Sequence, residues 1–473
     1  MDDAPLTAEE LSSELTGLVK DDSKLKKTYL MIGIGVAALL VILIIIIIIV
    51  ASTRGDKEEA SSLPVYGIIK CIYDISSTGE TKLLGDDFIK SFELEMFIEG
   101  KVQKFAKTYK FNSTGYHDVQ FKIHSESGVN LDYMFKGVED LKSIELTAER
   151  KCEITSMVST FENCYGLNHF NLTGFDGNKI TSMHKLFYAS ELMNFYFNSF
   201  NTDNLQDISY MFASTAISEL TIKGINTNKV TNMSHLFDNC PSTENYDFSS
   251  LDTSNVVYMS YMFQGNGAIK NLNLRDFKTI TVTTMKGMFK DCISLTYLDI
   301  TSFDTSKVED MSYMFDSCFA LEYLDLSKIN TPNLKKIEYM FGWCTELTQI
   351  NVSKLDTKNV ESTAGLFYQC TSLLDLDIST LDLSNNKDMS YMFYGCHLLS
   401  NIKFGKINTQ KVENMTNLFT QCSMLNSIDL SNFDTSNVVD MSFMFIDCTQ
   451  LFELDVSKFK TDKVVDMSYM FES

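Results

Sequence analysis

One phenylalanine recurs along most of this 473-residue chain at an almost constant interval. Successive copies lie 25 or 26 residues apart. They occupy positions 135, 161, 187, 212, 237, 263, 289, 315, 341, 367, 393, 419, 445 and 471. Such a register identifies a repeat protein. A unit this short cannot bury its own apolar face, so neighbouring units must stack into a solenoid with a continuous core.

The first half of each repeat has a pattern typical of a short strand. In the clearest copy, residues 295–303 follow the order L-x-x-L-x-L-x-x-F, which places alternate residues on one face. An Asx-Thr pair follows, here Asp304 and Thr305. Because such residues hydrogen-bond their own backbone, a column of them predicts a ladder of turns. We therefore expect thirteen strands, each followed by a turn.

The second half of each repeat reads V-x-D-M-S-Y-M-F-x-x-C and predicts a short helix. The Met, Met, Phe and Cys of this motif recur at spacings of three, four and seven, which is the inner stripe of a helix. An acidic or amide residue such as Asp310 stands at the N-cap position. The expected fold is an α/β repeat solenoid, with one short strand and one short helix per unit.

This repeat resembles that of the BspA-like leucine-rich repeat surface proteins, whose copies read much like FDTSxVxDMSYMFxxCxxLxxLDLS. The string is nearly complete at 303–326 and at 433–456, and the resemblance covers about 131–473. It implies a leucine-rich-repeat-like solenoid at a cell surface, with adhesion or interaction roles and no catalytic residue. Departures are local: Thr363 and Asn386 replace the usual Met and Val, so we expect those copies to pack less well.

We place the solenoid of about 13 repeats at residues 126–473, after a small β domain at 65–125. Alternating strand patterns in the second range, with a turn at Glu99 and Gly100, look like an immunoglobulin-like β-sandwich. Such a domain would cap the first repeat and hide its open apolar face. A separate ligand-binding module is the alternative.

An apolar segment near the N-terminus predicts a membrane span. Residues 28–53 carry no charge, and as a helix they would reach roughly 39 Å, enough to cross a bilayer. Three lysines precede the segment, which favours a cytosolic N-terminus. We expect a cytosolic tail (1–27), an uncleaved signal anchor (28–53) and a linker (54–64). This makes a single-pass type II protein with an extracellular or lumenal repeat region; a cleaved signal peptide is the alternative.

The charge balance and the missing motifs narrow the classes of function. A formal net charge of −22 argues against nucleic acid and anionic membrane surfaces as partners. No Gly-rich phosphate loop, HExxH motif or Ser/His/Asp arrangement stands out, and the six histidines occupy unrelated repeat positions. We therefore expect that the protein is not an enzyme and holds no resident cofactor.

Nine of the 11 cysteines occupy one repeat position. Neighbours in this column would lie near 5 Å apart, about the spacing of a disulfide. However, Ser190, Thr215 and Asn266 interrupt the column, so buried small apolar side chains explain it better. No CxxC motif supports zinc, and no metal site is predicted. Cys71 and Cys152 lie outside the column and could pair.

An acidic column follows the outward-facing strand position and is the candidate concave face of the solenoid. Its carboxylates are Asp247, Asp299, Asp325, Asp377, Asp429 and Asp455. Stacked carboxylates repel unless a cation or a basic partner intervenes, so one hypothesis is a face that binds Ca²⁺ or a basic ligand. The alternative is a solvated polar face, because Asn and Lys interrupt the column.

Five N-glycosylation sequons occur in the region expected to be exported. They begin at Asn112, Asn171, Asn232, Asn351 and Asn414. Sequons agree with export without proving it. Asn171 and Asn351 fall in the acidic column, where a glycan would obstruct part of a concave site.

These observations favour a cell-surface recognition or adhesion protein that binds a protein or glycan partner through its repeats. The alternative is a structural surface-coat component that self-associates laterally through the solenoid edges. A signalling receptor is the third reading, weakened by a short tail without an evident motif.

Overall fold

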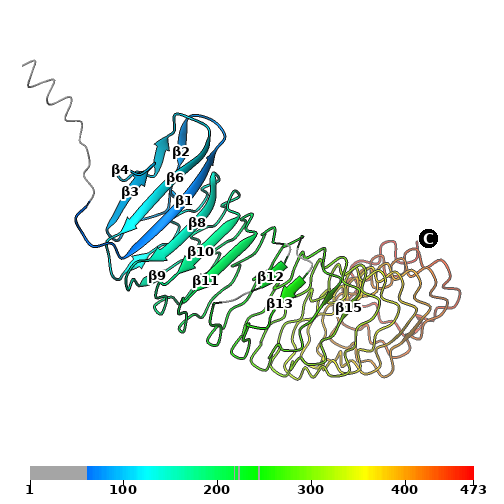
Figure 1. Cartoon of the computed structure of the whole chain (residues 1–473). Helices are drawn as coiled ribbons and strands as arrows, with labels where there is room; N and C mark the ends of the chain where they lie inside the picture. The colour runs from blue at the N-terminus through cyan, green and yellow to red at the C-terminus, as the bar shows by residue number, and fades with distance from the viewer. Residues whose placement is uncertain (1–60, 218, 222–223, 243–244, 473) are drawn as a thin grey trace, which may run out of the picture. The chain divides into compact units, whose positions relative to one another are not determined.

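The computed structural model describes residues 61–472, apart from 218, 222–223 and 243–244 (Figure 1). Strands and turns make up this part of the chain, and it contains no helix. The repeats form a β-solenoid in which each 26-residue unit is one coil. The prediction of an α/β solenoid with a helix in every unit is therefore wrong.

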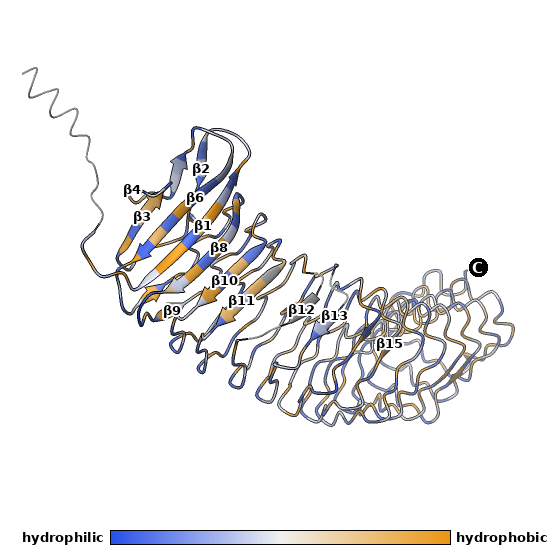
Figure 2. Ribbon diagram, viewed as in Figure 1, coloured by the Kyte–Doolittle hydropathy of each residue, from blue (hydrophilic) through white to orange (hydrophobic). Residues whose placement is uncertain are grey.

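The N-terminal part of the described chain is rich in strands. These are β1 (Gly67–Ile75), β2 (Glu80–Lys82), β3 (Leu94–Ile98), β4 (Lys101–Gln103), β5 (Thr108–Lys110), β6 (Gly115–Ile123), β7 (Val129–Asn130), β8 (Leu141–Ala148), β9 (Ile154–Ser156), β10 (His169–Thr173) and β11 (Asn194–Asn198). Seven of them form one sheet in the order β11-β10-β8-β1-β6-β3-β4. Apolar and polar residues alternate along β1 and β6 (Figure 2), as expected for strands with one buried face.

The pairing of these strands differs from the separate β-sandwich that the sequence predicted ahead of the repeats. Strand β1 pairs antiparallel with β6 on one side and with β8 on the other, while β8 pairs parallel with β10. Strands of 67–123 therefore continue directly into the sheet of the first coils. The hairpin at Glu99 and Gly100 is confirmed: both residues have positive φ (50° and 73°), and the hairpin joins β3 to β4.

Later coils carry shorter strands on the same side of the solenoid. These are β12 (Glu219–Thr221), β13 (Asn245–Asp247), β14 (Asn271–Leu272), β15 (Tyr297–Leu298), β16 (Asp375–Asp377) and β17 (Asn401–Lys403). They pair in parallel as β12 with β13, β14 with β15, and β16 with β17. At the predicted positions near 321, 347, 425 and 451 the chain forms no strand.

The segment predicted as a helix is a run of tight turns. Tyr313 and Ser317 have φ near 60° (59° and 61°), a left-handed conformation that an α-helix of L-residues does not contain. The Met314 N–H bonds the carbonyl three residues back (3.2 Å), whereas the Phe315 N–H donates to Met340 of the next coil (2.9 Å). Half of the amides therefore join coils to one another instead of closing helical turns.

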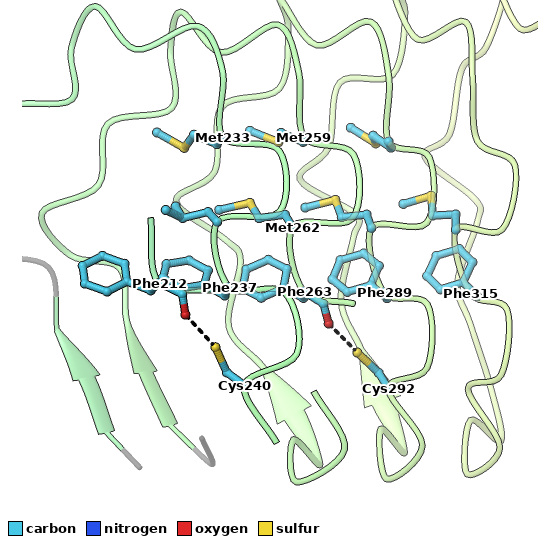
Figure 3. Packing of buried hydrophobic residues seen from close by; sticks show 14 of the residues in the cluster. Phe212, Met233, Phe237, Cys240, Met259, Met262, Phe263, Phe289, Cys292 and Phe315 are labelled. Carbon is cyan, nitrogen blue, oxygen red and sulfur yellow. Dashed lines mark hydrogen bonds between the residues drawn. The ribbon is translucent and has the colours of Figure 1, made fainter. Parts of the chain in front are cut away.

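The core is built from residue columns that run along the solenoid. The anchor phenylalanines stack coil on coil, as between Phe289 and Phe315, whose ring centroids are 5.7 Å apart with planes 8° apart. Methionines pack beside them (Figure 3), and Met311, Met314 and Cys318 are 0–1% exposed. The sequence pattern thus identified the buried residues correctly, although not the backbone that buries them.

The predicted turn ladder is confirmed, and a buried threonine reinforces it. The Thr305 hydroxyl donates to the Asn330 carbonyl of the next coil (2.8 Å), and the Asn330 N–H donates back to the hydroxyl (3.0 Å). Asp304 accepts a hydrogen bond from the N–H of Ser306 (2.9 Å), which holds the turn. A threonine hydroxyl thus joins neighbouring coils by hydrogen bonds, in addition to the bonds between their backbones.

The described residues give no support to the predicted single-pass type II membrane topology. Across the residues that the structure describes, no helix has the length and apolar character to cross a bilayer. The predicted tail (1–27) and signal anchor (28–53) lie outside the described residues.

Candidate functional site

The strand side of the solenoid carries an open groove of about 1060 Å³. Four successive coils between residues 323 and 403 line it, and we call it the strand-face groove. Its exposed polar or aromatic residues include Tyr323, Gln349, Asn351, Asp375, Asp377 and Lys403. The buried Ile350 (8% exposed) and Leu376 (2% exposed) also line it. A hydrophobic core therefore supports a polar surface.

The groove coincides with an interruption of strand pairing. Residues 321–326 and 347–352 form no strand, whereas the next two coils pair as β16 and β17. In the described chain, the N–H groups of Tyr323, Gln349 and Ile350 donate no hydrogen bond. Unpaired backbone groups at an open surface must be satisfied by water or by a ligand.

An ion pair joins two coils of the groove. The Lys403 ammonium donates to a carboxylate oxygen of Asp377 at 2.7 Å. The Ser379 N–H donates to the other oxygen (2.9 Å). These bonds, chiefly the one from Lys403, lower the pKa of Asp377 to about 2. The carboxylate is therefore ionised at any physiological pH, and Lys403 balances its charge.

The structure places the six predicted aspartates at equivalent positions of six coils, with Asn273, Asn351 and Lys403 at that position in the coils between them. Each aspartate accepts a hydrogen bond of 2.8–3.0 Å from the N–H two residues further on. Such bonds hold a turn. Hydrogen bonds from the side-chain hydroxyl and then from the N–H of the residue two positions on lower the pKa of Asp299, Asp429 and Asp455. The same two bonds, the backbone bond first, lower the pKa of Asp325. The column thus has a structural role, and only Asp377 lines the groove.

The Ca²⁺ hypothesis gains no support from this geometry. Basic side chains relieve part of the predicted repulsion, as where the Arg275 Nε lies 3.6 Å from Asp299. Among the described residues, no three His, Cys, Asp or Glu side chains are grouped so that they could hold a metal ion. Calcium binding remains a prediction from sequence.

The five sequon asparagines occupy different environments. Asn112 is exposed in the loop between β5 and β6, and Asn351 is exposed in the groove. Asn171 is half-buried in β10, where it accepts a bond from Asn198 (3.2 Å). Asn232 and Asn414 are half-buried and accept bonds from the N–H two residues on (3.0 Å each). Asn112 and Asn351 are thus the most accessible of the five.

The cysteine column belongs to the core. All eleven cysteines are buried and unpaired, including Cys71 and Cys152. Column thiols donate to the carbonyl of the anchor phenylalanine one coil earlier, as Cys240 and Cys292 do at 3.1 Å each (Figure 3). Burial raises the pKa of Cys292 to about 12, so its thiol is neutral and unsuited to nucleophilic chemistry.

Two features escaped the sequence analysis. One is the groove itself, with Tyr323, Gln349 and Asp375. The other is an aromatic cluster in which Trp343 contacts Phe319 and Tyr368, with ring centroids 6.4 and 5.7 Å apart. None of these three residues stands at the recurring Tyr position of the M-S-Y-M-F motif, so no repeat column indicated the second feature. Nothing in a single repeat indicates the first.

A family model described as "Mycoplasma protein of unknown function, DUF285" matches the repeats in four consecutive stretches. These are residues 129–221, 214–297, 291–403 and 397–473. No curated protein matches the chain.

Proposed function

The chain belongs to the DUF285 family, and we propose that it is a non-catalytic recognition protein that binds a protein or glycan partner at the strand-face groove. The observation that carries this proposal is the groove of about 1060 Å³, where charged, amide and aromatic side chains from four coils converge. Ligand sites commonly combine a concave surface with a few well-placed polar groups.

The rigidity of the solenoid supports this role. Side chains of the groove stand on coils whose cores are buried and whose turn segments, opposite the unpaired stretches, are joined by inter-coil backbone hydrogen bonds such as that from Phe341 N–H to Leu366 (3.1 Å). Such a surface loses little conformational entropy when a partner binds. The resemblance to BspA-like proteins, which act in adhesion or interaction, agrees with it.

The experiment is a binding screen of the purified full chain on arrays of glycans and of peptides. Asp377→Lys places two positive charges together in the groove, and Glu361→Lys is its matched control. Glu361 forms the same type of inter-coil pair with Lys387 (2.8 Å) but does not line the groove. We expect a ligand that wild type and Glu361→Lys bind and that Asp377→Lys has lost.

Two results would overturn the proposal. One is binding that Asp377→Lys leaves unchanged, which would place the partner elsewhere on the solenoid. The other is the absence of any array ligand together with self-association in light scattering. That second result would support the structural, laterally assembling role instead.

A further inference from the structure

We infer that the strand-face groove takes a neutral oligosaccharide. This inference rests on the proposed function and names its ligand class. It follows from the charge, the hydrogen-bonding groups, the exposed aromatic ring and the size of the groove.

Charge disfavours anionic ligands. Asp375 and Asp377 contribute two carboxylates to the groove, and Lys403 contributes the one ammonium group among its lining residues. Because Lys403 is engaged by Asp377 at 2.7 Å, it offers no free positive charge to an anion. A sialylated or sulfated glycan would also meet the overall charge of −22.

The hydrogen-bonding groups suit hydroxyl groups. Gln349 and Asn401 line the groove, and each side chain carries both an amide donor and a carbonyl acceptor. Asn351 also lines it, but its Oδ1 accepts the N–H of Ser353 (3.0 Å), so it offers chiefly its amide donor. The N–H groups of Tyr323 and Ile350, two of the lining residues, donate no hydrogen bond within the described chain. A sugar hydroxyl both donates and accepts, so a row of hydroxyls can satisfy such a mixed set. An apolar ligand would leave these groups unpaired, which costs affinity.

One aromatic ring provides an apolar surface beside these polar groups. Tyr323 is 49% exposed and lines the groove, and so does Leu374, also 49% exposed. The face of a pyranose carries C–H groups that pack against an aromatic ring while its hydroxyls point sideways. A ligand with an apolar face and a polar rim therefore matches both parts of the groove.

The size of the groove fits more than one sugar. Its volume of about 1060 Å³ lies just above the range of about 300–1,000 Å³ for small-molecule sites. The groove also extends over four coils, so successive sugars of a linear chain can meet successive coils.

The test compares two tyrosines that occupy the same position of neighbouring coils. Tyr323 lines the groove, whereas Tyr297 is 55% exposed but does not. Full-length wild type, Tyr323→Ala and Tyr297→Ala are applied to neutral oligosaccharides, sialylated and sulfated glycans, and peptides. The proteins are produced in a host without N-glycosylation, because a glycan on Asn351 would fill the groove. The fluorescence of Trp343, the single tryptophan, checks that each variant is folded.

We expect wild type to bind neutral oligosaccharides and Tyr323→Ala to weaken that binding by about tenfold or more, while Tyr297→Ala stays within about twofold. Binding of acidic glycans or peptides that Tyr323→Ala abolishes would overturn the carbohydrate inference and leave the proposed function intact. Binding that neither variant alters, or no binding by wild type, would overturn both.

Discussion

The thiol of Cys318 donates a hydrogen bond to the backbone carbonyl of Phe289, 29 residues earlier, at 3.1 Å. Where Asn266 replaces the cysteine, its side-chain amide donates to the equivalent carbonyl, that of Phe237, at 2.7 Å. The column is therefore a set of donors that satisfies buried carbonyls between coils. Its residues are small because the space beside the stacked phenylalanines is small.

We predict that the column thiols resist alkylation in the folded protein. Burial raises the pKa of Cys292 and of Cys396 to about 12, so the reactive thiolate is scarce near pH 8, and the sulfur is also inaccessible. Iodoacetamide followed by mass spectrometry should label them only after denaturation. Labelling of these cysteines at the same rate with and without denaturant would contradict the packing.

Gly365→Ala should destabilise the solenoid by about 1–3 kcal/mol. Gly365 has φ 62°, and a Cβ there would overlap the ring of Tyr339 from the preceding coil. Gly79→Ala is the matched control, because a Cβ at Gly79 meets no atom within 4 Å. Urea unfolding followed by Trp343 fluorescence measures both. Equal stability of the two variants would show that the Tyr339 ring does not pack against Gly365.

Thr363 and Asn386 should be energetically coupled. Both are fully buried, and the Thr363 hydroxyl lies 3.5 Å from the Asn386 amide. That amide is best oriented to accept from the Thr363 N–H (3.1 Å) and donate to the Asp388 carbonyl (3.0 Å). Thr363→Met or Asn386→Val alone leaves a polar group beside an apolar one. The double variant should therefore be more stable than the sum of the single changes, by about 0.5–3 kcal/mol. Additive effects in this cycle would refute the coupling.

Acid should weaken the protein within a defined pH window. The pKa of Asp377 is lowered to about 2, whereas an aspartate in the unfolded chain titrates near pH 3.9. A lowered pKa stabilises the folded state above the unfolded value, and this contribution disappears as pH falls from about 4 to about 2. Melting temperature should therefore fall over this range, and Asp377→Asn should show a smaller fall. A melting temperature that rises toward pH 2 would contradict a stabilising role for the hydrogen bonds that Lys403 and Ser379 donate to Asp377.

Much of the fold follows from the sequence, but the backbone of the second half-repeat does not. Spacings of three, four and seven fit a helix, and they equally fit turns that contain left-handed residues, since both bury the same side chains. The repeat position that Ser317 occupies did indicate left-handed residues. Other copies place Gly265, Gly395 and Asn239 there, residue types that tolerate positive φ, and all three have it (70°, 71° and 53°).

The first sheet and the groove required information that no single repeat contains. Alternation predicted β1 as a strand, but its pairing with β8 joins segments more than sixty residues apart. Asp377 could be found as a column member. That it lies in a groove could not be predicted, because the groove accompanies an interruption of strand pairing at 321–326 and 347–352 that no single repeat indicates.

Binding at the strand-face groove is tested most directly by calorimetric titration of the array-identified ligand into wild type, Lys403→Ala and Lys387→Ala. Both lysines bridge coils 26 residues apart, to Asp377 and Glu361 respectively, and only Lys403 lines the groove. We predict that Lys403→Ala raises Kd by about tenfold or more, while Lys387→Ala stays within about twofold of wild type. Equal Kd values for the three proteins would contradict recognition at the groove.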